Sequence, residues 1–116
     1  MPHLILTLTN NLAQEAYVPA ILTELAVALA EFETIDSRSI KAYAMSPSQW
    51  VMGEGAPEGF VHLEVALLSG RPLELRQAIA ERLASIVQHH YQVPHDEGRA
   101  SLTLELREMD RDTYQK

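Results

Sequence analysis

Two stretches of the chain carry the same alternation of hydrophobic and polar residues. PHLILTL (2–8) and VHLEVAL (61–67) place a hydrophobic residue at every second position, which is typical of a strand with one buried face. His3 falls opposite His62 when the two stretches are aligned. The spacing of the two copies predicts a duplicated unit of about 59 residues, and two copies are too few for a solenoid.

A helical pattern follows each of these strands. Pro19 precedes the first pattern and Pro72 the second, and proline is well tolerated in the first turn of a helix because the N–H it lacks has no partner there. Behind each proline, hydrophobic residues recur every three or four positions. They are Ile21, Leu22, Leu25, Leu29 and Phe32 in the first helix, and Leu75, Ile79, Leu83, Ile86 and Val87 in the second.

A second strand closes each half. RSIKAYAM (38–45) and ASLTLEL (100–106) have the composition and alternation of strands. Each half, about 2–46 and about 60–108, is therefore predicted to be a β-α-β unit whose crossover helix joins two parallel strands. The fold class we expect is α+β. One domain over residues 1–116 would hold a four-stranded mixed sheet with two helices on one face.

The alternation also assigns residues to the two faces of this sheet. The helix-facing residues are predicted to be Leu4, Leu6, Leu8, Val61, Leu63, Val65 and Leu67. The opposite face then holds His3, Ile5, Thr7, Lys41, Tyr43, Phe60, His62 and Glu64. A sheet face that is half apolar and is not covered by its own chain suggests a partner subunit.

Composition and charge narrow the classes of protein. The 116 residues carry a formal charge of −7, which argues against a nucleic-acid partner because phosphate binding needs a basic face. The chain has no cysteine, which excludes disulfides, thiolate nucleophiles and zinc–thiolate sites. No segment reads as a signal peptide or is apolar for long enough to span a bilayer, so we expect a cytoplasmic protein without membrane association.

Pro2 is the first residue with possible chemistry. A proline contributes little to a strand, because it cannot donate to the ladder. Removal of Met1 would expose a secondary α-amino group, and such a group titrates far closer to neutrality than lysine. Burial or a nearby cation would lower its pKa further and leave a neutral amine able to act as a base. The alternative is that proline occupies the second position by chance.

Arg71 lies just before the second helix, in SGRPLELRQ (69–77). A cation at a helix N-terminus opposes the helix dipole, whereas an anion bound there is stabilised by the free backbone N–H groups. Two interpretations remain open from the local sequence. Arg71 either pairs with Glu74 on the surface or forms part of a carboxylate-binding site, for which its planar fork is suited.

Other candidate residues have weaker signals. Lys41 and Tyr43 alternate on one strand and share a sheet face, which is most simply an exposed face. Trp50 lies between the two halves, where a packing role is the simpler interpretation. Three histidines lie near a helix end: His89, His90 and His95. Adjacent histidines on a helix point in different directions, which does not suit a shared metal ion. Histidine is also common near a helix C-terminus because the helix dipole stabilises its positive charge there, so no metal site is expected.

The order and spacing of several short motifs resemble the 5-carboxymethyl-2-hydroxymuconate isomerase family of the tautomerase superfamily. These motifs are MPH at the start, IKAYA followed by WVM and a glycine (40–55), FVHL (60–63) and GRPLELRQ (70–77). The resemblance extends from residue 2 to about residue 108. It implies a trimer of duplicated β-α-β subunits, no cofactor, and Pro2 as the base. It also implies that Arg71 binds substrate carboxylates. Two arginines of the family's middle strand are replaced here by Lys41 and Tyr43.

The function expected from these observations is isomerisation between keto and enol, or dienol, forms of a small unsaturated carboxylic acid. The resemblance suggests a substrate such as 5-carboxymethyl-2-hydroxymuconate and a place in aromatic-compound degradation. Pro2 would move the proton, Arg71 would bind a carboxylate, and Lys41 would bind a second carboxylate or stabilise the dienolate. Pocket-lining residues are expected among His3, Tyr43, Trp50, Phe60 and His62.

Two alternatives remain. One is a non-catalytic trimer that keeps the fold and binds a small acid or a protein partner, which the replacements at Lys41 and Tyr43 allow. The other is an unrelated ferredoxin-like ligand-binding domain, for which an amino-terminal proline has no evident use.

Overall fold

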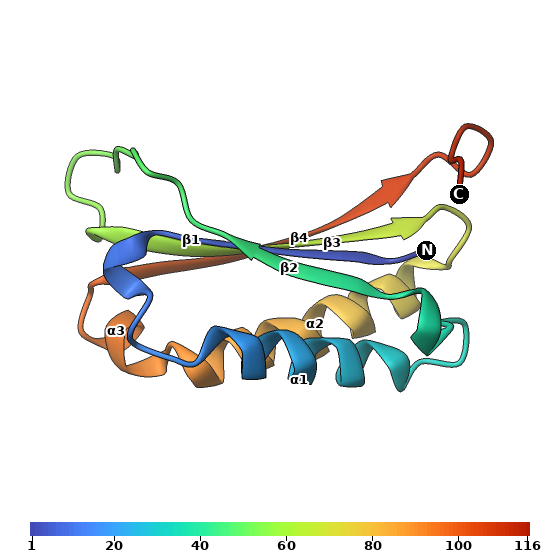
Figure 1. Ribbon diagram of the computed structural model, residues 1–116, viewed down its shortest axis with the longest axis horizontal. Helices are drawn as coiled ribbons and strands as arrows, with labels where there is room; N and C mark the ends of the chain where they lie inside the picture. Colours follow the sequence, from blue (N-terminus) through green and yellow to red (C-terminus); the bar gives the residue numbers. More distant parts are fainter.

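The computed structural model describes residues 1–116, which form one layer of strands and one layer of helices (Figure 1). The elements in chain order are β1 (His3–Leu8), α1 (Val18–Ala30), β2 (Lys41–Met45), β3 (Gly59–Leu68), α2 (Leu73–His90), α3 (Gln92–Asp96) and β4 (Ala100–Met109). None of the helices has the length and hydrophobicity needed to cross a membrane.

The four strands form one mixed sheet in the order β2-β1-β3-β4. β1 and β2 are parallel, as are β3 and β4, and in each pair a helix makes the connection. The central strands β1 and β3 are antiparallel. The predicted α+β class, with a four-stranded mixed sheet and helices on one face, is therefore confirmed.

The hydrophobic core lies between the sheet and the two long helices. All seven residues predicted to face the helices are at most 2% exposed: Leu4, Leu6, Leu8, Val61, Leu63, Val65 and Leu67. They form one cluster with buried residues of the helices, including Ile21, Leu25 and Leu29 of α1 and Ile79 and Leu83 of α2. Burying a side chain of this size contributes about 1.5–3 kcal/mol, so this face determines how the helices sit on the sheet.

The largest error of the sequence prediction concerns residues 38–40, which were expected to begin the second strand. Residues Ser37–Ser39 form a 3-10 turn instead, and the strand begins at Lys41. The Asp36 carboxylate accepts a hydrogen bond from the Arg38 backbone N–H at 3.0 Å, and Ser39 Oγ donates to the Asp36 carbonyl at 2.7 Å. Such local bonds compete with strand pairing.

Smaller differences occur at other element boundaries. α1 ends at Ala30, so Phe32 packs against the core from the following turn. β4 extends three residues beyond the predicted strand, to Met109, and pairs with β3 over its whole length. The short helix α3 was not predicted.

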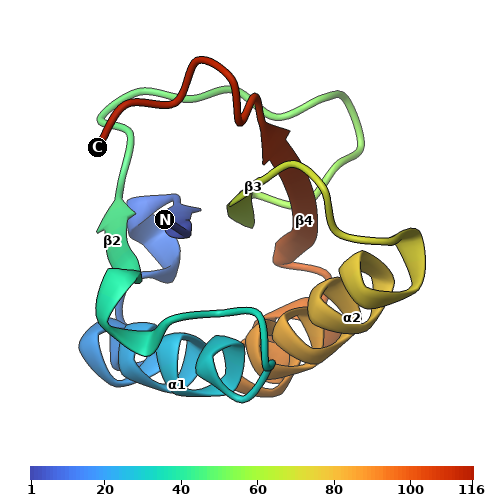
Figure 2. The same ribbon diagram turned by 90° about the vertical axis from the view of Figure 1, so that its right-hand side faces the viewer.

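One end of the sheet collects chain segments that are distant in sequence. β3 is antiparallel to β1, so the end of β3 lies beside the start of β1. β2 has the same direction as β1, and β4 has the same direction as β3. The starts of β1 and β2 and the ends of β3 and β4 therefore meet, and both chain termini lie there (Figure 1). The residues after β4 cross the sheet on the side opposite the helices (Figure 2).

Candidate active site

Pro2 is buried at the start of β1. Its carbonyl accepts a hydrogen bond from the Lys41 backbone N–H at 3.1 Å, and His3 is paired with Lys41 in the sheet register. Parallel pairing of β1 and β2 thus brings the first residues of the chain beside Lys41. The Lys41 side chain is exposed and has no ion-pair partner.

Arg71 reaches this end of the sheet from the turn between β3 and α2. Its guanidinium donates three hydrogen bonds: Nε to Thr34 Oγ1, Nη1 to the Leu68 carbonyl and Nη2 to the Thr34 carbonyl, each at 3.1 Å. No ion pair with Glu74 is formed, so that interpretation of Arg71 is wrong. All the partners are neutral oxygens, and the positive charge of this half-buried side chain has no carboxylate within 4 Å.

Several cations surround the α-amino group, which in the structure belongs to Met1. Burial is the main cause that lowers the pKa of this amine below its ordinary value of 8.0, and Arg71, Lys116 and Lys41 follow. Asp36 acts in the opposite direction but more weakly than these three cations. An amine in this environment is neutral over more of the physiological pH range than an ordinary α-amino group.

The unpaired cations of the chain are concentrated here. The sequence has nine lysines and arginines, and five arginines form ion pairs with Asp or Glu. The remaining four are Lys41, Arg71, Arg111 and Lys116. We call these four residues the cationic cluster. Each of them affects the pKa of the α-amino group or of Arg71. A chain of charge −7 thus has a positively charged region at its amino terminus.

His3 connects the first strand to the end of the chain. Its Nε2 lies 2.8 Å from the Tyr114 hydroxyl, and the two rings meet edge to face with centroids 6.1 Å apart. Burial lowers the pKa of His3, and Lys41, the α-amino group and Arg107 lower it further. His3 is therefore a neutral hydrogen-bonding partner of Tyr114 near neutral pH.

The other predicted site residues lie farther along the sheet. Tyr43 is paired with Ile5 and shares the face of His3 and Lys41, two residues away from them. Phe60 lies at the opposite end of β1, because its carbonyl accepts from the Thr9 backbone N–H.

Trp50 lies near Phe60, in the loop between β2 and β3. Its Nε1 donates to the Glu58 carbonyl at 3.2 Å. His62 is hydrogen-bonded through Nδ1 to Thr103 Oγ1 at 2.7 Å. The structure thus brings Pro2, His3, Lys41 and Arg71 together, and it does not bring Trp50, Phe60 or His62 to them within one chain.

Three residues near the amino terminus were missed by the sequence analysis: Arg111, Tyr114 and Lys116. They follow β4 by only a few residues. The predicted topology contained the necessary signal. A last strand that is parallel to its neighbour and antiparallel to the first strand ends near residue 2, so the basic and aromatic residues after it are candidates for the site.

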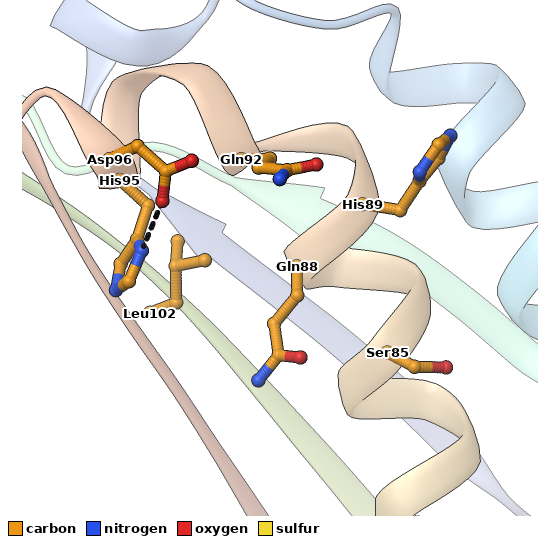
Figure 3. A pocket seen from close by; sticks show the side chains of 7 residues that line it. All are labelled: Ser85, Gln88, His89, Gln92, His95, Asp96 and Leu102. Carbon is orange, nitrogen blue, oxygen red and sulfur yellow. Dashed lines mark ion pairs between the residues drawn. The ribbon is translucent and has the colours of Figure 1, made fainter.

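The most prominent hollow on the surface lies elsewhere. It is an open depression of about 530 Å³ lined by residues of α2, α3 and β4 (Figure 3). α3 lies at the end of the molecule opposite the amino terminus (Figure 1). His95 is paired with Asp96 there at 3.5 Å, while the His89 ring lies well apart from both. No three His, Asp or Glu side chains anywhere in the chain are arranged to hold a metal ion.

Known proteins resemble this chain in sequence. The family model described as 5-carboxymethyl-2-hydroxymuconate isomerase matches residues 2–116. The 5-carboxymethyl-2-hydroxymuconate Delta-isomerase of Escherichia coli is 26% identical over 110 residues, which span 94% of this chain and 87% of that protein.

Solved structures show the same fold. A 5-carboxymethyl-2-hydroxymuconate isomerase from Deinococcus radiodurans superposes with a TM-score of 0.90 at 24% identity, over 99% of this chain and 87% of the other. A fused 4-OT described as a symmetric trimer gives a TM-score of 0.70 at 15% identity, over 97% and 91% of the two chains. The family match, the curated relative and the fold agree, and the chain belongs to the 5-carboxymethyl-2-hydroxymuconate isomerase family of the tautomerase superfamily.

Proposed function

We propose that the protein is an isomerase that interconverts keto and enol, or dienol, forms of a small unsaturated carboxylic acid such as 5-carboxymethyl-2-hydroxymuconate. The observation that carries the proposal is the position of Pro2 beside Lys41, in surroundings where burial, Arg71, Lys116 and Lys41 lower the pKa of the Met1 α-amino group. A base and an anion-binding region are the two components that such a proton transfer requires.

The base in this proposal is the ring nitrogen of Pro2 after removal of Met1. With Met1 attached, that nitrogen is part of an amide and has no basic lone pair. Once freed, the neutral amine takes a proton from the substrate, and the electron pair of the broken bond spreads into the conjugated system as a dienolate. The protonated proline then returns the proton to another carbon or oxygen, so no proton is gained or lost overall.

The cationic cluster provides the electrostatic part of the mechanism. Arg71 has five N–H groups, and three of them are used by Thr34 and Leu68, so two remain for a substrate carboxylate. Lys41 lies beside the first residues of the chain and would stabilise the negative charge that develops on the dienolate oxygen. The same cations favour the neutral form of the base, because they disfavour a second positive charge nearby.

We further propose that the subunits assemble as a trimer, as in the relatives described as symmetric trimers. The sheet face opposite the helices carries Tyr43 and Met45 at 44% and 54% exposure, and Val51 in the adjoining loop is 91% exposed. Covering these side chains with other copies would remove apolar surface from water. In such an assembly, Trp50 and Phe60 would act at a site only by reaching the amino terminus of another subunit.

The test compares untagged protein whose loss of Met1 is verified by intact mass with protein extended at the amino terminus. We expect the extension to leave the fold intact and to lower turnover of 2-hydroxymuconate or phenylpyruvate enol by roughly 10²–10⁴-fold, as for a lost general base. The fold is compared by circular dichroism. Equal turnover by the two preparations would refute the role of Pro2, and no turnover by either would favour the non-catalytic alternative.

A pH profile adds an independent readout. The protonated amine cannot accept a proton, so we expect kcat/KM of the wild type to fall as pH falls through the pKa of the Pro2 amine. Lys41 is one of the causes that lower the pKa of the Met1 amine, and we expect it to act in the same direction on Pro2, so Lys41→Met should raise the pKa of the base. The ascending limb of the profile should therefore move to higher pH in Lys41→Met, and an unmoved limb would show that the amine is not the titrating base.

A further inference from the structure

The residues after β4 fold back over the amino terminus. The backbone N–H groups of Thr113 and Tyr114 both donate to the Asp110 carbonyl, which makes a turn immediately after the strand. Tyr114 then reaches His3 at 2.8 Å. This segment, residues 110–116, crosses the sheet on the side opposite the helices (Figure 2), and it places Arg111 near Arg71.

Arg111 and Arg71 hold the same turn of the chain. The Arg111 backbone N–H donates to Ser69 Oγ at 3.3 Å, and Nε of its side chain donates to the Ser69 carbonyl at 3.0 Å. Arg71 donates to the preceding carbonyl, that of Leu68. A Cβ built on the intervening Gly70 would lie 3.7 Å from Arg111 Nη2, so the Arg111 side chain passes directly over this turn.

The two guanidinium groups differ in how many donors remain free. Three donors of Arg71 are engaged with neutral oxygens of the chain. Arg111 uses only Nε, so both of its terminal nitrogens are without a protein partner. A planar guanidinium with both terminal nitrogens available is suited to bidentate binding of a carboxylate.

Two like charges lie at one turn without a carboxylate partner of their own. Glu108 lies at the same turn, where its Oε2 accepts from the Gly70 backbone N–H at 3.4 Å, but its ion pair is with Arg76. Neither arginine has a carboxylate within 4 Å, although the chain holds sixteen Asp and Glu residues and pairs its other five arginines. Two cations side by side repel each other, and Arg111 accordingly contributes, after burial, to lowering the pKa of Arg71. A bound dianion would remove this repulsion.

We propose that Arg111 binds a second carboxylate of the substrate and so gives the site a preference for dicarboxylates over monocarboxylates. This inference rests on the proposed function for its substrate class and deepens it. Arg71 binds one carboxylate, and Arg111, from the segment after the last strand, binds the other. The contact between Tyr114 and His3 keeps that segment over the site.

The test measures binding rather than turnover, with two inert probes of equal length. trans,trans-Muconate and sorbate are six-carbon dienes that lack the enol hydroxyl, and they differ by one carboxylate. Isothermal titration calorimetry at low salt should give tighter binding of muconate by the Met1-free wild type. Arg111→Gln keeps a donor for the Ser69 carbonyl but removes the charge. This variant should weaken muconate binding by roughly tenfold and change sorbate binding by less than about twofold.

Two further variants separate charge from packing. Arg111→Lys should retain part of the preference, because it keeps the charge without the fork. Arg82→Ala removes an exposed arginine of α2 that is paired with Glu31, and it should leave both affinities unchanged. Equal affinities of the wild type for the two probes, or binding of neither, would overturn the proposal. Parallel losses for both probes in Arg111→Gln would also overturn it.

The outcome is independent of catalysis. Preference for muconate that depends on Arg111 in a protein that turns over no enol acid would support this inference and refute the proposed isomerase. Turnover that requires Pro2, together with equal binding of the two probes, would support the proposed isomerase and refute the role of Arg111.

Discussion

Replacement of Arg71 by alanine tests whether the side chain proposed to bind a substrate carboxylate also supports the fold. In the absence of ligand, its guanidinium joins the turn after β3 to the segment after α1 through Leu68 and Thr34. A hydrogen bond contributes about 0.5–1.5 kcal/mol net, and more when the donor is charged. The two bonds to Thr34 are exposed to solvent and belong at the low end of that range. We expect Arg71→Ala to lower the free energy of unfolding by about 2 kcal/mol.

The assay is urea unfolding followed by circular dichroism at a fixed subunit concentration, because assembly adds a concentration-dependent contribution to stability. Thr34→Val removes only the acceptor Oγ1, and it should cost about 0.5–1 kcal/mol. Arg38→Ala is the matched control, since Arg38 is exposed and makes one surface ion pair with Asp36, a kind of pair worth little. The reasoning is refuted if the midpoint of Arg71→Ala coincides with that of Arg38→Ala.

Two further outcomes follow from other features. Tyr91 is fully buried with a hydroxyl that has no hydrogen-bond partner, and burial raises its pKa to about 12. Tyr91→Phe should therefore leave stability unchanged or raise it by about 1 kcal/mol, as urea unfolding can show, and a clear loss would reveal a partner for the hydroxyl. For the assembly, light scattering at micromolar concentration should give the mass of three subunits, and a stable monomer would contradict the proposed trimer.

Much of the fold could be predicted because its signals are local. The alternation in β1 and β3 separates the buried leucines and valines from His3, Ile5 and Thr7, and the register confirms this division. The expectation was wrong at residues 38–40, where the side chain of Asp36 holds a turn that hydrophobic patterning does not report. The duplication of the two halves stays a prediction.

The candidate site could be predicted only in part. Pro2, Lys41 and Arg71 come together because strand order and direction place the start of β1 beside the start of β2 and the end of β3. Tyr114 lies 111 positions from His3 and reaches the site through the turn after β4. The course of that turn depends on local hydrogen bonds, and no periodic pattern in the sequence reports it. The alternation placed Phe60 on the same sheet face as His3, but it does not give the position along the strand. In the structure Phe60 and the nearby Trp50 lie at the other end of β1 from Pro2.

The strand order has a consequence for how the chain reaches its native state. β1 and β2 are separated by α1, β3 and β4 by α2, and the central pair joins residues as distant as His3 and Ala66. No two strands are connected by a hairpin, so sheet formation cannot begin with a short loop closure. Folding of such a topology is slow compared with that of a helical bundle of equal size. On a growing chain, the first strand must remain without its central partner until β3, which begins at Gly59, has been synthesised.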